Sequence, residues 1–198
     1  MIMMAMLTVL AAVLFAAGCC CGGAGSADRQ GVVTMRGKPL TLVGPQLQAG
    51  DAAPSFTAVA ADLSTYHFAP GDGKTWIISA VPSVDTPVCS IQTKRFNDEA
   101  ARLAPKVGVI AISMDLPFAQ KRWCAAEGAK NLQVVSDYRD RAFGLAYGVY
   151  IKENGLLARS VFVVGPDGRL ALVHIVPELT SEPDYDTVLA AAKKAAGL

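Results

Sequence analysis

The residues best suited to chemistry are Thr86 and Cys89, which lie three positions apart in the segment PSVDTPVC (residues 82–89). The apolar run at 76–81 before this segment predicts a buried strand, and residues 88–104 carry apolar side chains at helical spacing. Cys89 is therefore expected in the first turn of a helix. Unpaired backbone N–H groups and the positive end of the helix dipole lie there, and both favour a thiolate. The alternative for an isolated cysteine is a small buried hydrophobe.

This segment resembles the active-site motif of the peroxiredoxins, Pro-x-x-x-Thr-x-x-Cys. The stretch DLPFAQKRWCAAEG at 115–128 is similar to the segment that carries the resolving cysteine in the thiol peroxidase subfamily, the atypical two-cysteine peroxiredoxins. Further similarities are RGKPLT at 36–41, LAR at 157–159 and VPELTSEPDY at 176–185. The resemblance spans about residues 32 to 198, with its motifs in the family's order.

The resemblance implies a thiol-dependent peroxidase that reduces hydrogen peroxide and organic hydroperoxides without haem, flavin or metal. When a thiolate attacks a peroxide, negative charge builds on the leaving oxygen, so hydrogen-bond donors must already point at it. The resemblance gives this role to the Thr86 hydroxyl, the Cys89 backbone N–H and the Arg159 guanidinium, and it places Pro82 and Thr86 with Arg159 in the substrate site. Without the motif context, Arg159 is an ordinary cation at a strand start and Thr86 an ordinary helix N-cap.

Attack leaves Cys89 as a sulfenic acid, which a second thiol converts to a disulfide. The resemblance makes Cys124 this resolving partner, and it is the only other cysteine within residues 32–198. Two helix-borne cysteines need Cα atoms within about 7 Å to form a disulfide. We therefore expect the turn at Cys89 and the helix at 117–127 to unwind locally when they join, with Trp123 as a fluorescent reporter.

The resemblance also implies partners for the reaction. Recycling of the disulfide requires an external dithiol, thioredoxin or another reductant of that class, and the family forms homodimers. The loop at 151–156 is shorter than in many thiol peroxidases, which would reshape the substrate entrance or the dimer contact.

Three other functions are compatible with some of these residues. An exported thiol–disulfide oxidoreductase would use the two cysteines without peroxidase activity, and a non-enzymatic lipoprotein would hold them in a static structural disulfide. A Cys–His hydrolase would need His67 or His174 to activate the thiol. Both histidines fall in strand-like sequence and are expected to be structural.

The N-terminal sequence predicts export. Residues 1–18 are almost continuously apolar, and no charged residue occurs before Asp28, which is typical of a signal peptide or a membrane anchor. The run AAGC at 16–19 resembles a bacterial lipobox, which makes Cys19 a candidate for lipidation. Residues 19–31 are rich in small residues and predict a flexible linker. We expect a membrane-anchored lipoprotein or a periplasmic protein that touches the membrane only through this segment.

Composition predicts one globular domain at 32–198. The chain has 198 residues, of which 52% are hydrophobic and 18% charged, and a net charge of +1 gives no basis for nucleic-acid binding. The alternation of strands and helices predicts an α/β fold. The order resembles a thioredoxin-like fold, a central mixed sheet flanked by helices, with an N-terminal β-hairpin extension. The expected strands are 32–35, 40–43, 56–60, 66–68, 76–81, 107–112, 132–135, 160–164 and 170–175, and the expected helices are 88–104, 117–127, 141–147 and 184–196.

Overall fold

A computed structural model describes residues 28–198. The predicted signal segment 1–18, the lipidation candidate Cys19 and the linker up to residue 27 lie outside the described residues. Among the helices of the described part, none combines the length and the apolar character that a bilayer span requires.

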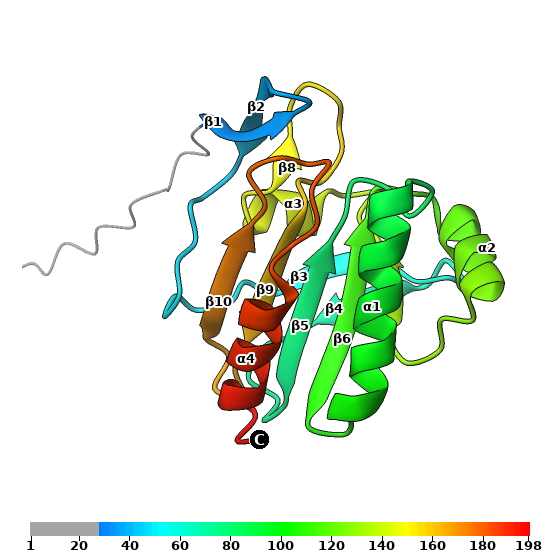
Figure 1. Ribbon diagram of the computed structural model, residues 1–198, viewed down its shortest axis with the longest axis vertical. Coiled ribbons are helices and arrows are strands. Elements are labelled where there is room, and N and C mark those ends of the chain that lie inside the picture. Colours follow the sequence, from blue (N-terminus) through cyan, green and yellow to red (C-terminus); the bar gives the residue numbers. More distant parts are fainter. Residues whose placement is uncertain (1–27) are drawn as a thin grey trace, which may run out of the picture.

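A seven-stranded mixed sheet forms the centre of the molecule, with strand order β10-β9-β5-β6-β7-β3-β4 (Figure 1). Its strands are β3 (Phe56–Val59), β4 (Thr65–Phe68), β5 (Thr75–Ala80), β6 (Val107–Ser113), β7 (Gln133–Ser136), β9 (Ser160–Val164) and β10 (Leu170–Ile175). The pairs β5–β6 and β6–β7 are parallel, and the helix that each requires as a crossover is present. The remaining pairs are antiparallel. The predicted thioredoxin-like fold is confirmed.

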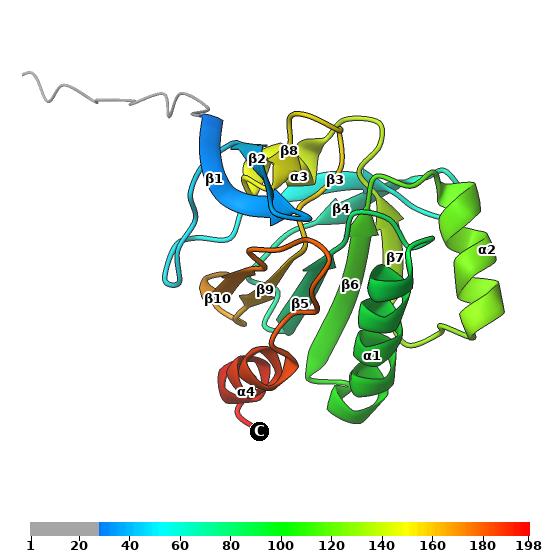
Figure 2. The ribbon, with the colours of Figure 1, turned by 45° about the horizontal axis from the view of Figure 1, so that its top comes forward.

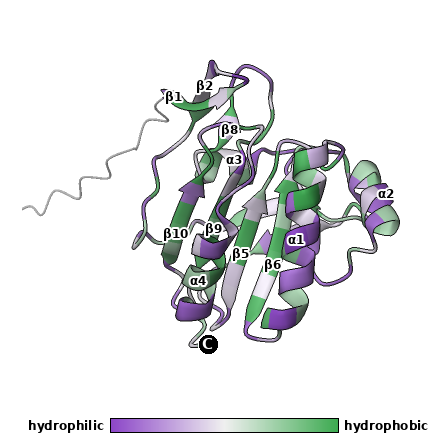
Figure 3. Cartoon of the chain, viewed as in Figure 1, coloured by the Kyte–Doolittle hydropathy of each residue, from purple (hydrophilic) through white to green (hydrophobic). Residues whose placement is uncertain are grey.

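Helices cover both faces of this sheet. They are α1 (Pro87–Leu103), α2 (Pro117–Glu127), α3 (Ala142–Ala146) and α4 (Tyr185–Ala195). Helices α1 and α4 share one face, where Phe96 and Val188 join a buried apolar cluster with Ile77 (Figure 2). On the opposite face, Phe143 of α3 packs in a second cluster with Ile78. Strands β6 and β10 are largely hydrophobic, whereas α1 and α4 turn hydrophilic residues outwards (Figure 3).

The N-terminal hairpin forms a separate three-stranded sheet. Strands β1 (Asp28–Met35) and β2 (Lys38–Val43) pair antiparallel, and β8 (Tyr150–Ile151) pairs with β2. The hairpin is confirmed, but β1 begins at Asp28, so residues 28–31 are strand rather than linker. The register shifts between Gln30 and Val33, and Gly31 between them has a φ of +74°. This bulge breaks the alternation that marks a strand in sequence. Strand β8 has two residues and was not predicted.

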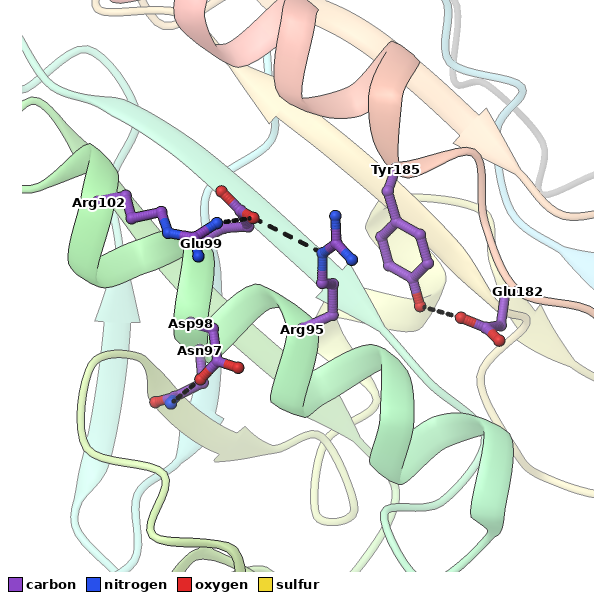
Figure 4. Close-up of polar contacts among 7 residues, drawn as sticks. All are labelled: Arg95, Asn97, Asp98, Glu99, Arg102, Glu182 and Tyr185. Carbon is purple, nitrogen blue, oxygen red and sulfur yellow. Dashed lines mark hydrogen bonds and ion pairs between the residues drawn. The ribbon is translucent and has the colours of Figure 1, made fainter.

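Polar contacts join the start of α4 to α1 (Figure 4). Glu99 accepts from Arg102 at 2.8 Å and lies 3.6 Å from Nε of Arg95, both on α1. The Arg95 guanidinium stacks over the ring of Tyr185, 5.6 Å from its centroid. The Tyr185 hydroxyl donates to Glu182 at 2.8 Å. These contacts fix the loop before α4 relative to the helix that begins at the predicted motif.

Candidate functional site

Strand register brings Cys89 and Arg159 together. Strand β9 runs antiparallel to β5, and Ala80 at the end of β5 lies opposite Ser160 at the start of β9. Arg159 therefore lies beside the loop that leads from β5 into α1. Cys89 falls in the first turn of α1, as predicted, and Pro87 starts that helix at a position where a missing N–H costs nothing.

Arg159 is held by three hydrogen bonds in a buried position. Its Nη2–H donates to Sγ of Cys89 at 3.3 Å, its Nη1–H to Oε1 of Gln92 at 2.6 Å, and its Nε–H to the backbone carbonyl of Leu179 at 2.9 Å. Gln92 in turn donates through Nε2 to Oγ of Ser79 at 2.8 Å. The guanidinium plane is thus fixed by α1, β5 and the loop after β10.

The contact between Arg159 and Cys89 is buried on both sides. Arg159 is 2% exposed and Cys89 is fully buried. A buried cation is costly unless a negative charge lies beside it. Apart from Cys89, the hydrogen-bond partners of Arg159 are neutral, namely the Gln92 amide and the Leu179 carbonyl. Among these three partners of Arg159, the Cys89 thiol is the ionisable one, and a permanent cation lies directly against its sulfur.

A mostly apolar pocket opens beside this pair. Its volume is about 260 Å³, and Met35, Arg36, Pro82, Thr86, Pro87, Val88, Leu156, Arg159, Leu179 and Thr180 line it. The structure thus brings the predicted residues Pro82, Thr86 and Arg159 to one cavity, with Cys89 buried next to it. Leu156, at the end of the short 151–156 loop, forms part of the same wall.

Thr86 occupies the N-cap position of α1 but does not cap it through its side chain. Its backbone is extended, and no side-chain capping bond is formed. The hydroxyl instead donates to the backbone carbonyl of Ser83 at 3.2 Å. A rotation of this side chain would be needed to free the hydroxyl for a bound peroxide.

Glu178 attaches the N-terminal hairpin to the pocket. Its carboxylate accepts from the Thr180 hydroxyl at 2.7 Å and from the backbone N–H groups of the hairpin turn 36–37 at 3.0 and 3.1 Å. These hydrogen bonds, with that from Thr180 the largest contribution, hold the pKa of Glu178 well below its ordinary value. The neighbouring Leu179 carbonyl binds Arg159, so one short segment fixes both the hairpin and the guanidinium.

Cys124 lies on α2, and both described cysteines are free thiols. Cys124 is half-buried, and this burial raises the pKa of its thiol. It packs against a small cluster formed by Val81, Val84, Cys89 and Trp123. The predicted pair therefore shares one apolar cluster without being bonded.

Two polar contacts connect the surroundings of Cys89 to α2. The Asp115 carboxylate, just before α2, accepts from the Ser83 hydroxyl at 2.7 Å and from the Val84 N–H at 2.8 Å. Further along, Nε1–H of Trp123 donates to Oγ of Ser90 at 2.8 Å. Both contacts join segments that the chain separates by about thirty residues.

Sequence reasoning missed Gln92, Glu178 and Asp115. Gln92 had a detectable signal, because it lies one helical turn after Cys89 on the buried face that also carries Phe96. A polar residue at such a position requires a buried partner. Glu178 and Asp115 lie in segments that resemble the family, but no local pattern indicated their contacts, because their partners are distant in sequence.

The two histidines lie away from Cys89. His67 is on β4 at one edge of the main sheet, and His174 is on β10 at the other, where its Nε2 accepts from the Asp184 N–H at 3.2 Å. Neither contacts the thiol, so a Cys–His hydrolase is not supported. Within residues 28–198 no cluster of three or more His, Cys, Asp or Glu side chains is placed to bind a metal ion.

Known proteins resemble this chain over most of its length. The Redoxin family model matches residues 48–189. A thiol peroxidase of Listeria innocua serovar 6a is 53% identical over 163 residues, which cover 82% of this chain and 98% of the relative. A thiol peroxidase of Bacillus subtilis (strain 168) is 50% identical over 161 residues, 81% of this chain and 96% of the relative. The crystal structure of a peroxiredoxin-like protein from Aquifex aeolicus, 44% identical, has a TM-score of 0.78 and covers 82% of this chain and 96% of that one.

Proposed function

The chain belongs to the redoxin family and is a thiol-dependent peroxidase, and from this premise we propose that Cys89 is its peroxidatic cysteine and Cys124 its resolving cysteine. The observation that carries the proposal is the buried contact between Arg159 and Sγ of Cys89. It places a permanent positive charge against the sulfur, beside a pocket with room for a small peroxide.

In the first step, the Cys89 thiolate attacks one peroxide oxygen and the O–O bond breaks. The sulfur becomes a sulfenic acid, and the departing oxygen takes a proton to leave as water or an alcohol. Arg159 suits this step because its charge is permanent and its planar fork presents several donors at once. Thr86 lines the same pocket, and its hydroxyl, once rotated away from the Ser83 carbonyl, is the second donor proposed for the leaving oxygen. Pro82 forms part of the pocket wall.

In the second step, the Cys124 sulfur attacks the sulfenic acid, a disulfide forms and water leaves. Burial raises the pKa of the Cys124 thiol, so local opening of α2 would both expose this thiol and ease its ionisation. An external dithiol such as thioredoxin then reduces the disulfide to two thiols and becomes oxidised itself.

The pocket supports small peroxides and alkyl hydroperoxides as substrates. Its walls include the apolar side chains of Met35, Val88, Leu156 and Leu179. These side chains would pack favourably against the alkyl group of an organic hydroperoxide. Hydrogen peroxide and organic hydroperoxides are therefore the proposed substrate classes.

The sequence alone supports two further proposals, one about location and one about assembly. The apolar segment 1–18 and Cys19 support an exported protein anchored by a lipidated N-terminus. The family resemblance supports a homodimer.

Mass spectrometry of the N-terminal peptide from cell membranes tests the anchor, since an intact Met1 or a soluble cleaved chain would contradict it. Sedimentation of the purified protein tests the dimer.

Thiol mapping after peroxide treatment tests the catalytic proposal. Fully reduced protein receives one equivalent of peroxide, free thiols are trapped, and the peptides are analysed by mass spectrometry. We expect a rapid Cys89–Cys124 disulfide in the wild type and none in Cys89→Ser. Cys124→Ser should complete one peroxide reduction and then over-oxidise to a sulfinic acid. Persistent free thiols in the wild type, or full activity of Cys89→Ser, would contradict the proposal.

The same samples separate the two remaining alternatives. A static structural disulfide would resist mild dithiols, whereas a catalytic disulfide should be reduced readily. A thiol–disulfide oxidoreductase would exchange with a disulfide substrate but would leave peroxide unconsumed.

A further inference from the structure

One hydrogen bond joins the residues adjacent to the two cysteines. Trp123 immediately precedes Cys124 on α2, and Ser90 immediately follows Cys89 on α1. The indole Nε1–H of Trp123 donates to Oγ of Ser90 at 2.8 Å, across 33 positions of chain. Trp123 is 7% exposed, and its ring packs in the cluster that contains Cys89 and Val84. The contact therefore holds α2 against the first turn of α1.

The fold places Arg159 and Cys124 on opposite sides of Cys89. Arg159 precedes β9, which is the neighbour of β5 on one side. Helix α2 contacts β7, which lies two strands away on the other side. Figures 1 and 2 both show α2 beyond α1, on the side away from α4. Because Sγ of Cys89 faces Arg159 in the thiol state, it must turn away from the guanidinium to meet Cys124.

The Trp123–Ser90 bond opposes this turn, since it keeps the two segments in their present orientation. A second contact between α1 and α2, Lys94 with Glu127 at 3.7 Å, is solvent-exposed on both side chains and contributes little. The Asp115 carboxylate holds the loop at 83–84 and not the body of α2. Of the contacts that described residues make between the helices, the indole bond is the buried one nearest to both cysteines.

We propose, on the premise of the function proposed above, that Trp123 is a positioning residue whose bond to Ser90 delays resolution of the Cys89 sulfenic acid. Two reactions compete for that sulfenic acid. The Cys124 thiol can condense with it to give the disulfide and water, or a second peroxide can oxidise it to a sulfinic acid and leave as an alcohol or water. By retaining Cys89 beside the peroxide pocket, the bond lengthens the time available to the second reaction. Trp123 thus sets the sensitivity of the enzyme to over-oxidation.

Rapid-quench mass spectrometry of the full chain tests this proposal with hydrogen peroxide as the probe. Trp123→Phe keeps an aromatic ring and removes the donor, and Ser90→Ala removes the acceptor. Each should accelerate disulfide formation roughly 2- to 12-fold, the factor that corresponds to one net hydrogen bond. At excess peroxide, each should lower the sulfinic fraction of Cys89. The rate of the first peroxide attack should stay at the wild-type value, because neither residue touches Arg159 or lines the pocket.

A double variant and a matched control give the test its specificity. Trp123→Phe combined with Ser90→Ala should resolve no faster than either single variant, because both remove one and the same bond. Trp76→Phe is the control, since its indole also donates to a side chain, Asp72, at a site remote from Cys89. It should leave resolution and over-oxidation unchanged.

Distinct outcomes separate failure of this proposal from failure of the function on which it rests. If the wild type forms no Cys89–Cys124 disulfide, the proposed function is wrong. If the wild type forms it and both variants resolve at the wild-type rate or more slowly, the role of Trp123 is wrong. Should Trp123→Phe fail to fold, Ser90→Ala decides the question, because it removes a single oxygen from a half-buried position.

Discussion

The two sides of Cys89 are built in different ways. On the side of Arg159, the guanidinium is 2% exposed and its three hydrogen bonds come from α1 and from the loop after β10. On the side of Cys124, the thiol is half-buried, and one partly buried side-chain hydrogen bond, from Trp123 to Ser90, joins α2 to the first turn of α1. The first side is suited to hold charge in a fixed geometry, and the second is suited to open.

This difference corresponds to the two steps of the reaction. Peroxide reduction needs donors that are already in place when charge develops, and a buried, cross-linked guanidinium meets that need without reorganisation. Resolution needs movement, because Sγ of Cys89 must leave its contact with Arg159 to form a bond with the sulfur of Cys124. A segment that few buried contacts hold opens locally at a lower free energy. Helix α2 is held by fewer buried contacts than β5 or β9.

Arg159→Lys gives the largest expected effect and tests the rigid side. The lysine keeps the positive charge but loses the fork that binds the Cys89 sulfur, Gln92 and the Leu179 carbonyl together. The second-order rate of Cys89 oxidation should fall about 10²- to 10³-fold, the usual cost of one preorganised donor. Stopped-flow measurement of the first turnover checks this. Arg95→Lys, an exposed arginine on α1, is the control, and equal losses in both variants would refute a special role for Arg159.

Gln92→Leu tests whether Arg159 must be positioned through its neighbour. The substitution leaves Nη1 of Arg159 and the hydroxyl of Ser79 without their buried partner. Unfolding in urea should show a loss of about 1–3 kcal/mol, and the first-turnover rate should drop roughly 5- to 10-fold, less than in Arg159→Lys. A variant that loses stability but reduces peroxide at the wild-type rate would show that Gln92 is structural only.

The elements around the site were largely predictable, whereas the contacts that tune it were not. Strand β5, helix α1 and strand β9 have strong apolar periodicity, and the motif residues Cys89 and Arg159 lie at their ends. Strand β8 is two residues long and has no periodicity to detect. The bulge at Gly31 similarly concealed the start of β1.

Contacts between distant segments depend on register and crossover geometry, which a single sequence does not encode locally. Glu178 binds a hairpin turn about 140 residues before it, and Trp123 binds a serine 33 residues before it. Gln92 lies between these two cases. Its place on the buried face of α1 indicated that it has a polar partner but did not identify Arg159 as that partner. The resemblance supplied the pairing with Cys124, which the structure leaves unbonded.

Amide hydrogen exchange sharpens the contrast between the two sides. In the disulfide form, residues of α2 and the first turn of α1 should exchange faster than in the thiol form, because the helical bonds near both cysteines must break. Strands β5 and β9 should retain their protection. Mass spectrometry of peptides from both forms checks this. Identical protection of α2 in the two forms would mean that the cysteines join without local opening.

The smallest effect is expected where the hairpin meets the rigid side. Glu178→Gln keeps one acceptor oxygen but weakens the bonds to Thr180 and to the turn 36–37, so the pocket wall at Met35 and Arg36 should loosen. Peroxide reduction should slow about twofold, with Arg159 still bound by Gln92. A loss as large as that of Arg159→Lys would mean that the hairpin, and not α1, fixes the guanidinium.

Acid unfolding isolates the contribution of Glu178 to stability. Hydrogen bonds hold its folded-state pKa far below the ordinary 4.5, so its stabilising effect is complete above pH 4.5 and is lost as the pH falls below that value. Asp137 acts in the opposite direction, because burial raises its pKa from 3.8 to about 6, and its contribution declines as the pH rises through that range. The stability difference between the wild type and Glu178→Gln in urea titrations should therefore be constant above about pH 5 and shrink progressively as the pH falls below 4.5. Parallel curves over the whole range would show that the carboxylate does not stabilise the attachment of the hairpin to the Arg159 side.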